Sequence, residues 1–218
     1  MATFILIPGG WQGGWAFEKV AELLIARGHN AQPLTLAGLG DVPAPSANLD
    51  LHISEAVSAI RAHRGEEIVL AGHSYGGMVV SGAADVESSH LRALVYSDAY
   101  VPQSGDSVWS LTSARFREAF ISGAAADGLS CAPPPNLDPR CRPHPMATFL
   151  QAIRLSGRWR DVPRKTYVGA HGWEGSPFLD LYQRLRADPE WTTMAFDCGH
   201  NIPRLKPEAF AEILLAQV

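Results

Sequence analysis

Hydrophobic residues recur along the chain in two patterns, as short continuous runs and as longer stretches with helical spacing. Short runs rich in β-branched and aromatic residues predict strands. Six such runs occur, at residues 3–7, 32–36, 67–71, 91–97, 165–169 and 193–197. In residues 15–27 and 53–63 the apolar positions are three or four apart, which predicts helices. Each helical stretch is followed by a glycine that suits a helix C-terminal cap, Gly28 or Gly65.

The alternation of strands and helices predicts an α/β fold, with a mostly parallel six-stranded sheet and helices on both of its faces. It stops between residues 100 and 162, where a proline-rich stretch is flanked by aromatic residues. A long segment of this kind inside an α/β domain is usually functional. We therefore expect a core of residues 1–99 and 163–218, and a small cap or lid insertion of residues 100–162. A poorly ordered loop is the alternative for the insertion.

The candidate chemistry lies at the end of the third predicted strand. Gly72-His73-Ser74-Tyr75-Gly76-Gly77 follows an apolar run and precedes a stretch compatible with a helix. Glycines two residues on either side of a serine are typical of a nucleophile elbow, which exposes the serine on a tight turn at a helix N-terminus. The five-letter pattern is weak alone, and its place between strand and helix makes it informative. Ser74 is the predicted nucleophile.

A serine hydroxyl needs a base that accepts its proton. His200 follows the last predicted strand and precedes a helical stretch at residues 207–215, which is where a nucleophile elbow fold places its histidine. His144 and His171 are weaker candidates for the base. Four other histidines are expected on solvated helix ends or polar faces: His29, His52, His63 and His90.

An oxyanion hole requires two N–H donors aimed at the developing negative charge. Tyr75, directly after the serine, supplies one of them. The turn Pro8-Gly9-Gly10-Trp11-Gln12-Gly13-Gly14 follows the first strand and offers the second donor from Gly10 or Trp11. A phosphate-binding loop would need the pattern GxxxxGK[ST], which this turn lacks.

With Ile7-Pro8-Gly9-Gly10, the serine motif and Gly199-His200 in this order, the chain resembles the α/β-hydrolase superfamily over nearly its whole length. The resemblance is greatest to the branch of plant methylesterases and hydroxynitrile lyases, although Pro8-Gly9 stands where that branch commonly has His-Gly. The lyases need a hydroxyl beside the serine and a lysine near the histidine. Gly10 stands in the first place and no lysine follows Gly169 in its loop, which disfavours lyase chemistry.

Two residues compete for the carboxylate that orients the histidine. Many members of the superfamily place an aspartate after the penultimate strand, where this chain has Glu174 as the only carboxylate of the loop. A second arrangement, similar to haloalkane dehalogenases and some lipases, places the acid after the strand that follows the nucleophile helix. Asp98 stands there and is favoured over Glu174. Asp98 as a loop cap or a substrate ligand is the remaining alternative.

Composition narrows the classes of partner. The chain has 218 residues, with 18 basic and 22 acidic side chains and no basic run, so a nucleic-acid partner is not expected. No stretch reaches the roughly 18 apolar residues of a membrane span, and the N-terminal residues lack signal-peptide features, so we expect a cytoplasmic protein without a membrane partner. Cys131 and Cys141 could pair in an oxidising compartment, but free thiols are favoured. The sequence predicts no metal or cofactor and leaves a homodimer open.

The leading prediction is a serine hydrolase that cleaves a small carboxylic ester or lactone through an acyl-enzyme. The predicted site has catalytic Ser74, His200 and Asp98, oxyanion-hole Gly10 and Tyr75, and substrate-binding Trp11 and Tyr100. The aromatic residues suggest a flat aromatic or polyketide-like substrate, or they simply form core. One alternative keeps the fold for C–C cleavage, decarboxylation or cyclisation of a metabolite. The other is a ligand-binding protein without activity.

Overall fold

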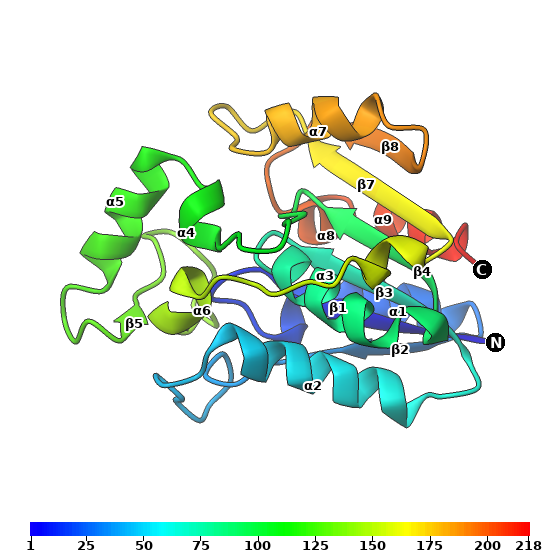
Figure 1. Cartoon of the computed structure of the whole chain (residues 1–218), viewed down its shortest axis with the longest axis horizontal. Coiled ribbons are helices and arrows are strands. Elements are labelled where there is room, and N and C mark those ends of the chain that lie inside the picture. Colours follow the sequence, from blue (N-terminus) through cyan, green and yellow to red (C-terminus); the bar gives the residue numbers. More distant parts are fainter.

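A parallel six-stranded sheet runs through the middle of the computed structural model, which describes all 218 residues (Figure 1). The strands are β1 (Ala2–Ile7), β2 (Asn30–Pro33), β3 (Glu67–His73), β4 (Leu91–Ser97), β7 (Arg164–Ala170) and β8 (Trp191–Phe196). Their spatial order is β2-β1-β3-β4-β7-β8. The predicted α/β fold is confirmed. The strand expected at residues 32–36 lies instead at 30–33, because only Asn30–Pro33 are in register with β1, and its proline is tolerated at the sheet edge.

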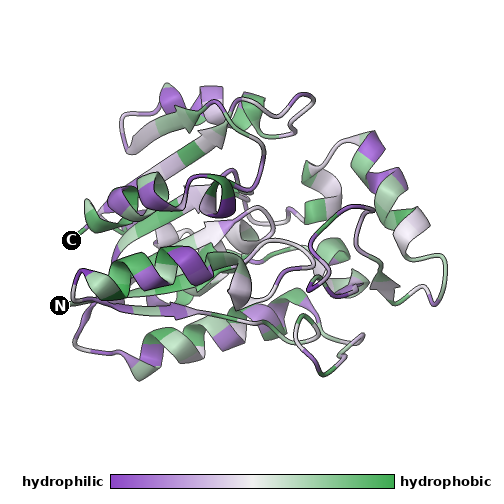
Figure 2. Ribbon diagram, turned by 180° about the vertical axis from the view of Figure 1, so that it is seen from behind, coloured by the Kyte–Doolittle hydropathy of each residue, from purple (hydrophilic) through white to green (hydrophobic).

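Helices cover both faces of the sheet (Figures 1 and 2). One face carries α2 (Leu49–Ala62), α3 (Gly76–Glu87) and α7 (Leu179–Arg186), and the other carries α1 (Glu18–Ala26) and α9 (Pro207–Leu215). Shorter pieces are the 3-10 helices η1 (Gly14–Phe17) and η2 (Ser88–His90), and α8 (Ile202–Leu205). Successive strand residues face opposite layers, as Leu70 and Val69 of β3 do. Strands that are buried on both sides consist of continuous apolar runs, and this is why the sequence pattern predicted their positions.

Most of the segment between β4 and β7 lies beyond the carboxyl ends of the strands, and its last residues run back along α3 to the start of β7, whereas both chain termini lie at the opposite end of the molecule (Figure 1). It contains α4 (Val108–Leu111), α5 (Ala114–Gly123), the two-stranded pair β5 (Ser130–Cys131) and β6 (His144–Pro145), α6 (Met146–Leu150) and the 3-10 helix η3 (Arg158–Asp161). We call residues 100–162 the cap segment. Its function as a lid remains a prediction.

Asp85 of α3 fastens the end of the cap segment to the core. Its carboxylate, only 6% exposed, accepts hydrogen bonds from the backbone N–H groups of Ser156 at 2.6 Å, Gly157 at 2.9 Å and Trp159 at 3.1 Å. Burial by itself raises the pKa of Asp85, but these donors outweigh it and the pKa is lowered. Asp85 is therefore a charged acceptor at neutral pH, placed where the chain re-enters the sheet.

We expect Asp85→Ala to lower the free energy of unfolding by about 3 kcal/mol, because three N–H donors lose a charged acceptor. Urea unfolding followed by circular dichroism measures the change. Asp161→Ala is the matched control, since Asp161 is an exposed aspartate of η3 and its loss should change stability by less than about 0.5 kcal/mol. Equal effects of the two substitutions would contradict the anchoring role of Asp85.

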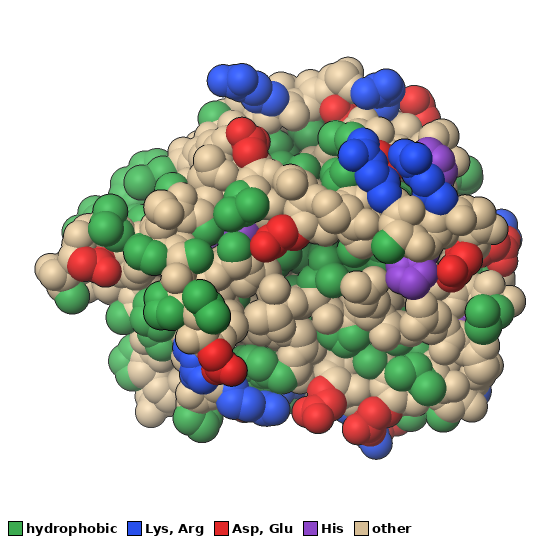
Figure 3. Space-filling view, turned by 90° about the horizontal axis from the view of Figure 1, so that it is seen from below, with side chains coloured by type: hydrophobic (Ala, Val, Ile, Leu, Met, Phe, Trp, Pro, Cys, Tyr) green, Lys and Arg blue, Asp and Glu red, His purple; other side chains and the backbone are tan.

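Charged side chains of both signs occur in small groups over the surface shown in Figure 3. Several form ion pairs, such as Arg61 with Glu87 at 2.6 Å and Arg204 with Asp138 at 2.8 Å.

The helices are too short or too polar for any of them to cross a membrane. All three cysteines are free, as the sequence favours.

Candidate active site

Ser74 occupies a sharp turn between β3 and α3. Its φ of 53° is in the left-handed region, which is uncommon for a residue other than glycine. A Cβ atom on Gly72 would lie 2.7 Å from Val80 Cγ2, and one on Gly76 would lie 2.6 Å from the carbonyl oxygen of Ile7. Glycine at position 72 therefore allows β3 and α3 to approach closely, and glycine at position 76 allows α3 to pack against the end of β1. The turn presents the Ser74 side chain to the carboxyl ends of the strands.

Asp98, at the end of β4, is the carboxylate that the fold brings to His200. The Nδ1–H of His200 donates to Asp98 Oδ2 at 2.6 Å, and the N–H of Ala170 donates to Asp98 Oδ1 at 3.1 Å. Asp98 is 2% exposed and has a φ of 43°, a second strained position at this site. Glu174, the alternative acid, is exposed in the loop after β7 and lines a neighbouring cavity.

Burial shifts the pKa values of His200 and Asp98 in opposite directions. Aromatic rings surround His200, with Trp173 at a centroid distance of 4.2 Å and Phe178 at 5.7 Å. This environment lowers the pKa of His200, so its ring is neutral at neutral pH. Burial raises the pKa of Asp98 to about 6, although the Ala170 N–H opposes the shift. Above pH 7 the pair therefore consists of an ionised carboxylate and a neutral imidazole, the form that can accept a proton.

Gly10 and Tyr75 both line the cavity, and the backbone N–H of neither residue donates a hydrogen bond among the turns and loops of the protein. Trp11, the other candidate from the first turn, donates its backbone N–H to His144 Nδ1 at 3.1 Å. That bond holds Trp11 at a φ of 64° and leaves Gly10 as the available donor of the turn. His144, a candidate base by sequence, is fully buried behind this turn and also contacts Thr148 through Nε2 at 2.8 Å.

The structure corrects the position that the sequence predicted for His52. It was predicted on a solvated helix face, but it is fully buried on the inner side of α2. Its Nε2–H donates to the carbonyl of Ala37 at 2.9 Å, and its Nδ1 accepts from the Tyr75 hydroxyl at 2.8 Å. Both ring nitrogens are satisfied by segments distant in sequence, which allows burial and lowers the pKa of His52 to about 4.

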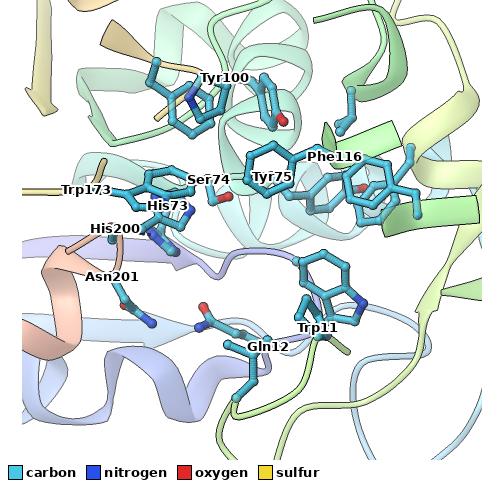
Figure 4. A pocket seen from close by; sticks show the side chains of 18 residues that line it. Trp11, Gln12, His73, Ser74, Tyr75, Tyr100, Phe116, Trp173, His200 and Asn201 are labelled. Atoms are coloured by element: carbon cyan, nitrogen blue, oxygen red, sulfur yellow. Dashed lines mark hydrogen bonds between the residues drawn. The ribbon is translucent and has the colours of Figure 1, made fainter. Parts of the chain in front are cut away.

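Ser74 and His200 open onto a cavity of about 300 Å³ between the sheet and the cap segment (Figure 4). Most of its wall is aromatic or aliphatic, and no lysine, arginine, aspartate or glutamate lines it. The predicted contact residues Trp11 and Tyr100 are both in the wall. Three polar lining residues were not singled out by sequence: Gln12, His73 and Asn201. Their only signal was adjacency to Trp11, Ser74 and His200, which says nothing about side-chain direction.

Comparisons with known proteins agree with this architecture. The profile of a family described as "Alpha/beta hydrolase family" matches residues 4–213. The chain is 34% identical over 240 residues to the carbendazim hydrolyzing esterase of Nocardioides sp. (strain SG-4G), with 99% of each chain covered. It is 32% identical over 107 residues to salicylic acid-binding protein 2 of Nicotiana tabacum, covering 46% of this chain and 40% of that protein. An extracellular alpha/beta-hydrolase from a Paenibacillus species superposes with a TM-score of 0.85 at 19% identity, covering 100% and 99% of the two chains.

Proposed function

The chain belongs to the alpha/beta hydrolase family, and from that premise we propose that it is an esterase in which Ser74 attacks the carbonyl carbon of a small carboxylic ester. The observation that carries the proposal is the 2.6 Å hydrogen bond from His200 to buried Asp98, beside a serine held on a strained turn. A histidine oriented in this way presents its other nitrogen, Nε2, for the serine proton. The same residues can therefore activate the nucleophile and later protonate the leaving group.

The reaction divides into two steps that use the same groups. Ser74 Oγ bonds to the carbonyl carbon while its proton moves to His200 Nε2, and the negative charge on the carbonyl oxygen is held by the N–H groups of Gly10 and Tyr75. The intermediate expels the alcohol, which takes the proton from His200, and an acyl-enzyme remains. Water then gives its proton to His200 and attacks the acyl carbon, releasing the acid and restoring Ser74. Asp98 stabilises the transient imidazolium throughout.

The cavity wall supports an uncharged, flat acyl group as substrate. Aromatic residues of the cap segment, Phe116, Phe120 and Phe149, line the same cavity as Ser74, and no ionic side chain is present there to neutralise a charged substrate. Moving an ion from water into such a site without a partner is costly. We therefore propose aromatic esters as the preferred class, with the cap segment excluding water above them. The name of the Nocardioides relative adds carbendazim as a substrate to test.

A small panel of substrates tests this function. Phenyl acetate, methyl benzoate and carbendazim are each incubated with the enzyme, and the acid or amine product is quantified by liquid chromatography. We expect turnover of neutral aromatic esters, and a kcat/KM for monomethyl terephthalate, which carries a carboxylate, at least about tenfold below that for methyl benzoate. Lack of turnover with every ester would contradict the proposed esterase, and equal rates for the charged and neutral esters would contradict the proposed substrate class.

The pH dependence of kcat/KM is expected to have an acidic limb near pH 6. Activity requires ionised Asp98 and neutral His200, and the raised pKa of Asp98, about 6, means that the active form predominates above this value and is lost below it. Initial rates on phenyl acetate, which does not titrate, should be constant above pH 7 and fall about tenfold per pH unit below pH 5.5. A rate unchanged down to pH 4.5, in protein that circular dichroism shows to be folded, would contradict this assignment.

A further inference from the structure

Three polar side chains in the wall of the cavity have buried atoms without any hydrogen-bond partner. These atoms are Gln12 Oε1, His73 Nδ1 and Asn201 Oδ1. Gln12 is 7% exposed and His73 is 3% exposed, and both line the cavity together with Asn201. Buried polar atoms are nearly always paired, because an unpaired one loses its bonds to water without replacement. Three unpaired acceptors in the wall of one largely apolar cavity therefore point to a polar ligand.

The local backbone keeps these atoms together. A Cβ atom on Gly9 would lie 2.7 Å from His73 Nδ1 and 3.2 Å from Gln12 Oε1, so both side chains occupy space that only glycine leaves open. The Nε2–H of His73 donates to the carbonyl of His200 at 3.1 Å, which leaves Nδ1 as an acceptor. Burial lowers the pKa of His73 to about 3, so the ring remains neutral and keeps this acceptor.

Gln12 and Asn201 lie on the side of the cavity where the leaving alcohol of the ester is expected. Gln12 and Asn201 lie on the His200 side of Ser74, apart from Phe116, and their amide groups point into the same part of the cavity (Figure 4). His200 must protonate the departing alcohol, so the alcohol portion of the substrate lies on its side of Ser74. The acyl group then faces the aromatic rings of the cap segment.

We propose that Gln12, His73 and Asn201 form a polar recess that binds a hydroxyl group on the alcohol portion of the ester, an inference that rests on the proposed function. A hydroxyl can donate its one hydrogen bond to one of these acceptors and accept hydrogen bonds from the NH₂ groups of Gln12 and Asn201, whose side chains make no hydrogen bond within the protein. The preferred substrates are then hydroxyalkyl esters of aromatic acids. The recess specifies the leaving alcohol, and the aromatic wall specifies the acid.

Two esters of similar size test the recess, 2-hydroxyethyl benzoate and propyl benzoate. They share an acyl group and differ in a terminal hydroxyl or methyl, so the ratio of their kcat/KM values measures recognition of the hydroxyl. We expect a ratio of about ten or more for the wild type, and a ratio near one for Gln12→Met and for Asn201→Leu. Gln183→Met, at an exposed position of α7, is the matched control and should keep the wild-type ratio. Thermal unfolding establishes that each variant is folded.

Each other outcome has a distinct meaning. A wild-type ratio near one, or a ratio that both recess substitutions leave unchanged, would overturn the proposed recess while the esterase function stands. An equal loss on both esters would assign the recess to the hydrolytic water and overturn its role in leaving-group recognition. Methyl 4-hydroxybenzoate, which carries its hydroxyl on the acyl group, should gain no advantage over methyl benzoate, and a gain that Gln12→Met removes would contradict the leaving-group placement. Failure of the wild type on both benzoates would overturn the recess if phenyl acetate is still hydrolysed, and failure on all three esters would contradict the proposed esterase function.

Discussion

Ser74→Ala is expected to lower kcat for ester hydrolysis by about 10⁵-fold, because the substitution removes the oxygen that forms the acyl-enzyme. Residual activity would come from the oxyanion donors of Gly10 and Tyr75 acting on bound ester and water. The fold should be unaffected, since alanine keeps the Cβ atom and the backbone bonds of the turn, including the Ser74 N–H donated to the Ser97 carbonyl at 3.3 Å.

Initial rates on phenyl acetate measure the loss, with enzyme concentrations high enough to detect the residual rate. Ser58→Ala is the control, because Ser58 is an exposed serine of α2 far from the cavity, and its activity should equal that of the wild type. A folded Ser74→Ala protein that retains more than about 1% of wild-type kcat would rule out Ser74 as the nucleophile.

Asp98→Asn is expected to lower kcat by about 10³- to 10⁴-fold, whereas Glu174→Gln should change it by less than about threefold. Asparagine keeps the size of the side chain but removes the charge that stabilises the His200 imidazolium, and it can hold the ring in the wrong tautomer. Glu174 is exposed and has no hydrogen bond to His200, so losing its charge should have little effect.

The two carboxylate variants are compared on the same ester at pH 8, where Asp98 is ionised in the wild type. Equal thermal unfolding midpoints would establish that the comparison concerns catalysis and not stability. A large loss in Glu174→Gln together with an active Asp98→Asn would reverse the assignment of the acid.

Local sequence patterns were sufficient to predict the helices and strands that are determined by residues close together in the chain. The helix expected at residues 207–215 occurs as α9 (Pro207–Leu215), and β4 occurs at the predicted residues 91–97, because apolar periodicity and terminal residues define both. The Ser74 turn depends in part on the close approach of Gly72 to Val80 and Gly76, which all lie within one strand-turn-helix unit. Such local signals are readable without knowledge of the sheet order.

Features that depend on contacts between distant segments could not be determined from local sequence patterns. Asp98 and Glu174 both follow predicted strands, and only the packing of the loops after β4, β7 and β8 determines which one meets His200. The burial of His52 depends on Ala37 and Tyr75, which no helical periodicity reveals. The aromatic residues of the cap segment divide in a similar way, since Phe149 lines the cavity while Trp159 packs beside Trp191.

The central claim is that Ser74 is the residue that becomes covalently acylated. Mass spectrometry of the protein after treatment with a fluorophosphonate tests it directly, because this reagent bonds to a serine activated by a neighbouring histidine. We expect one phosphonyl group per chain, located on Ser74, and no labelling of Ser74→Ala. A label on another residue, or an active wild-type enzyme that remains unlabelled, would contradict the account.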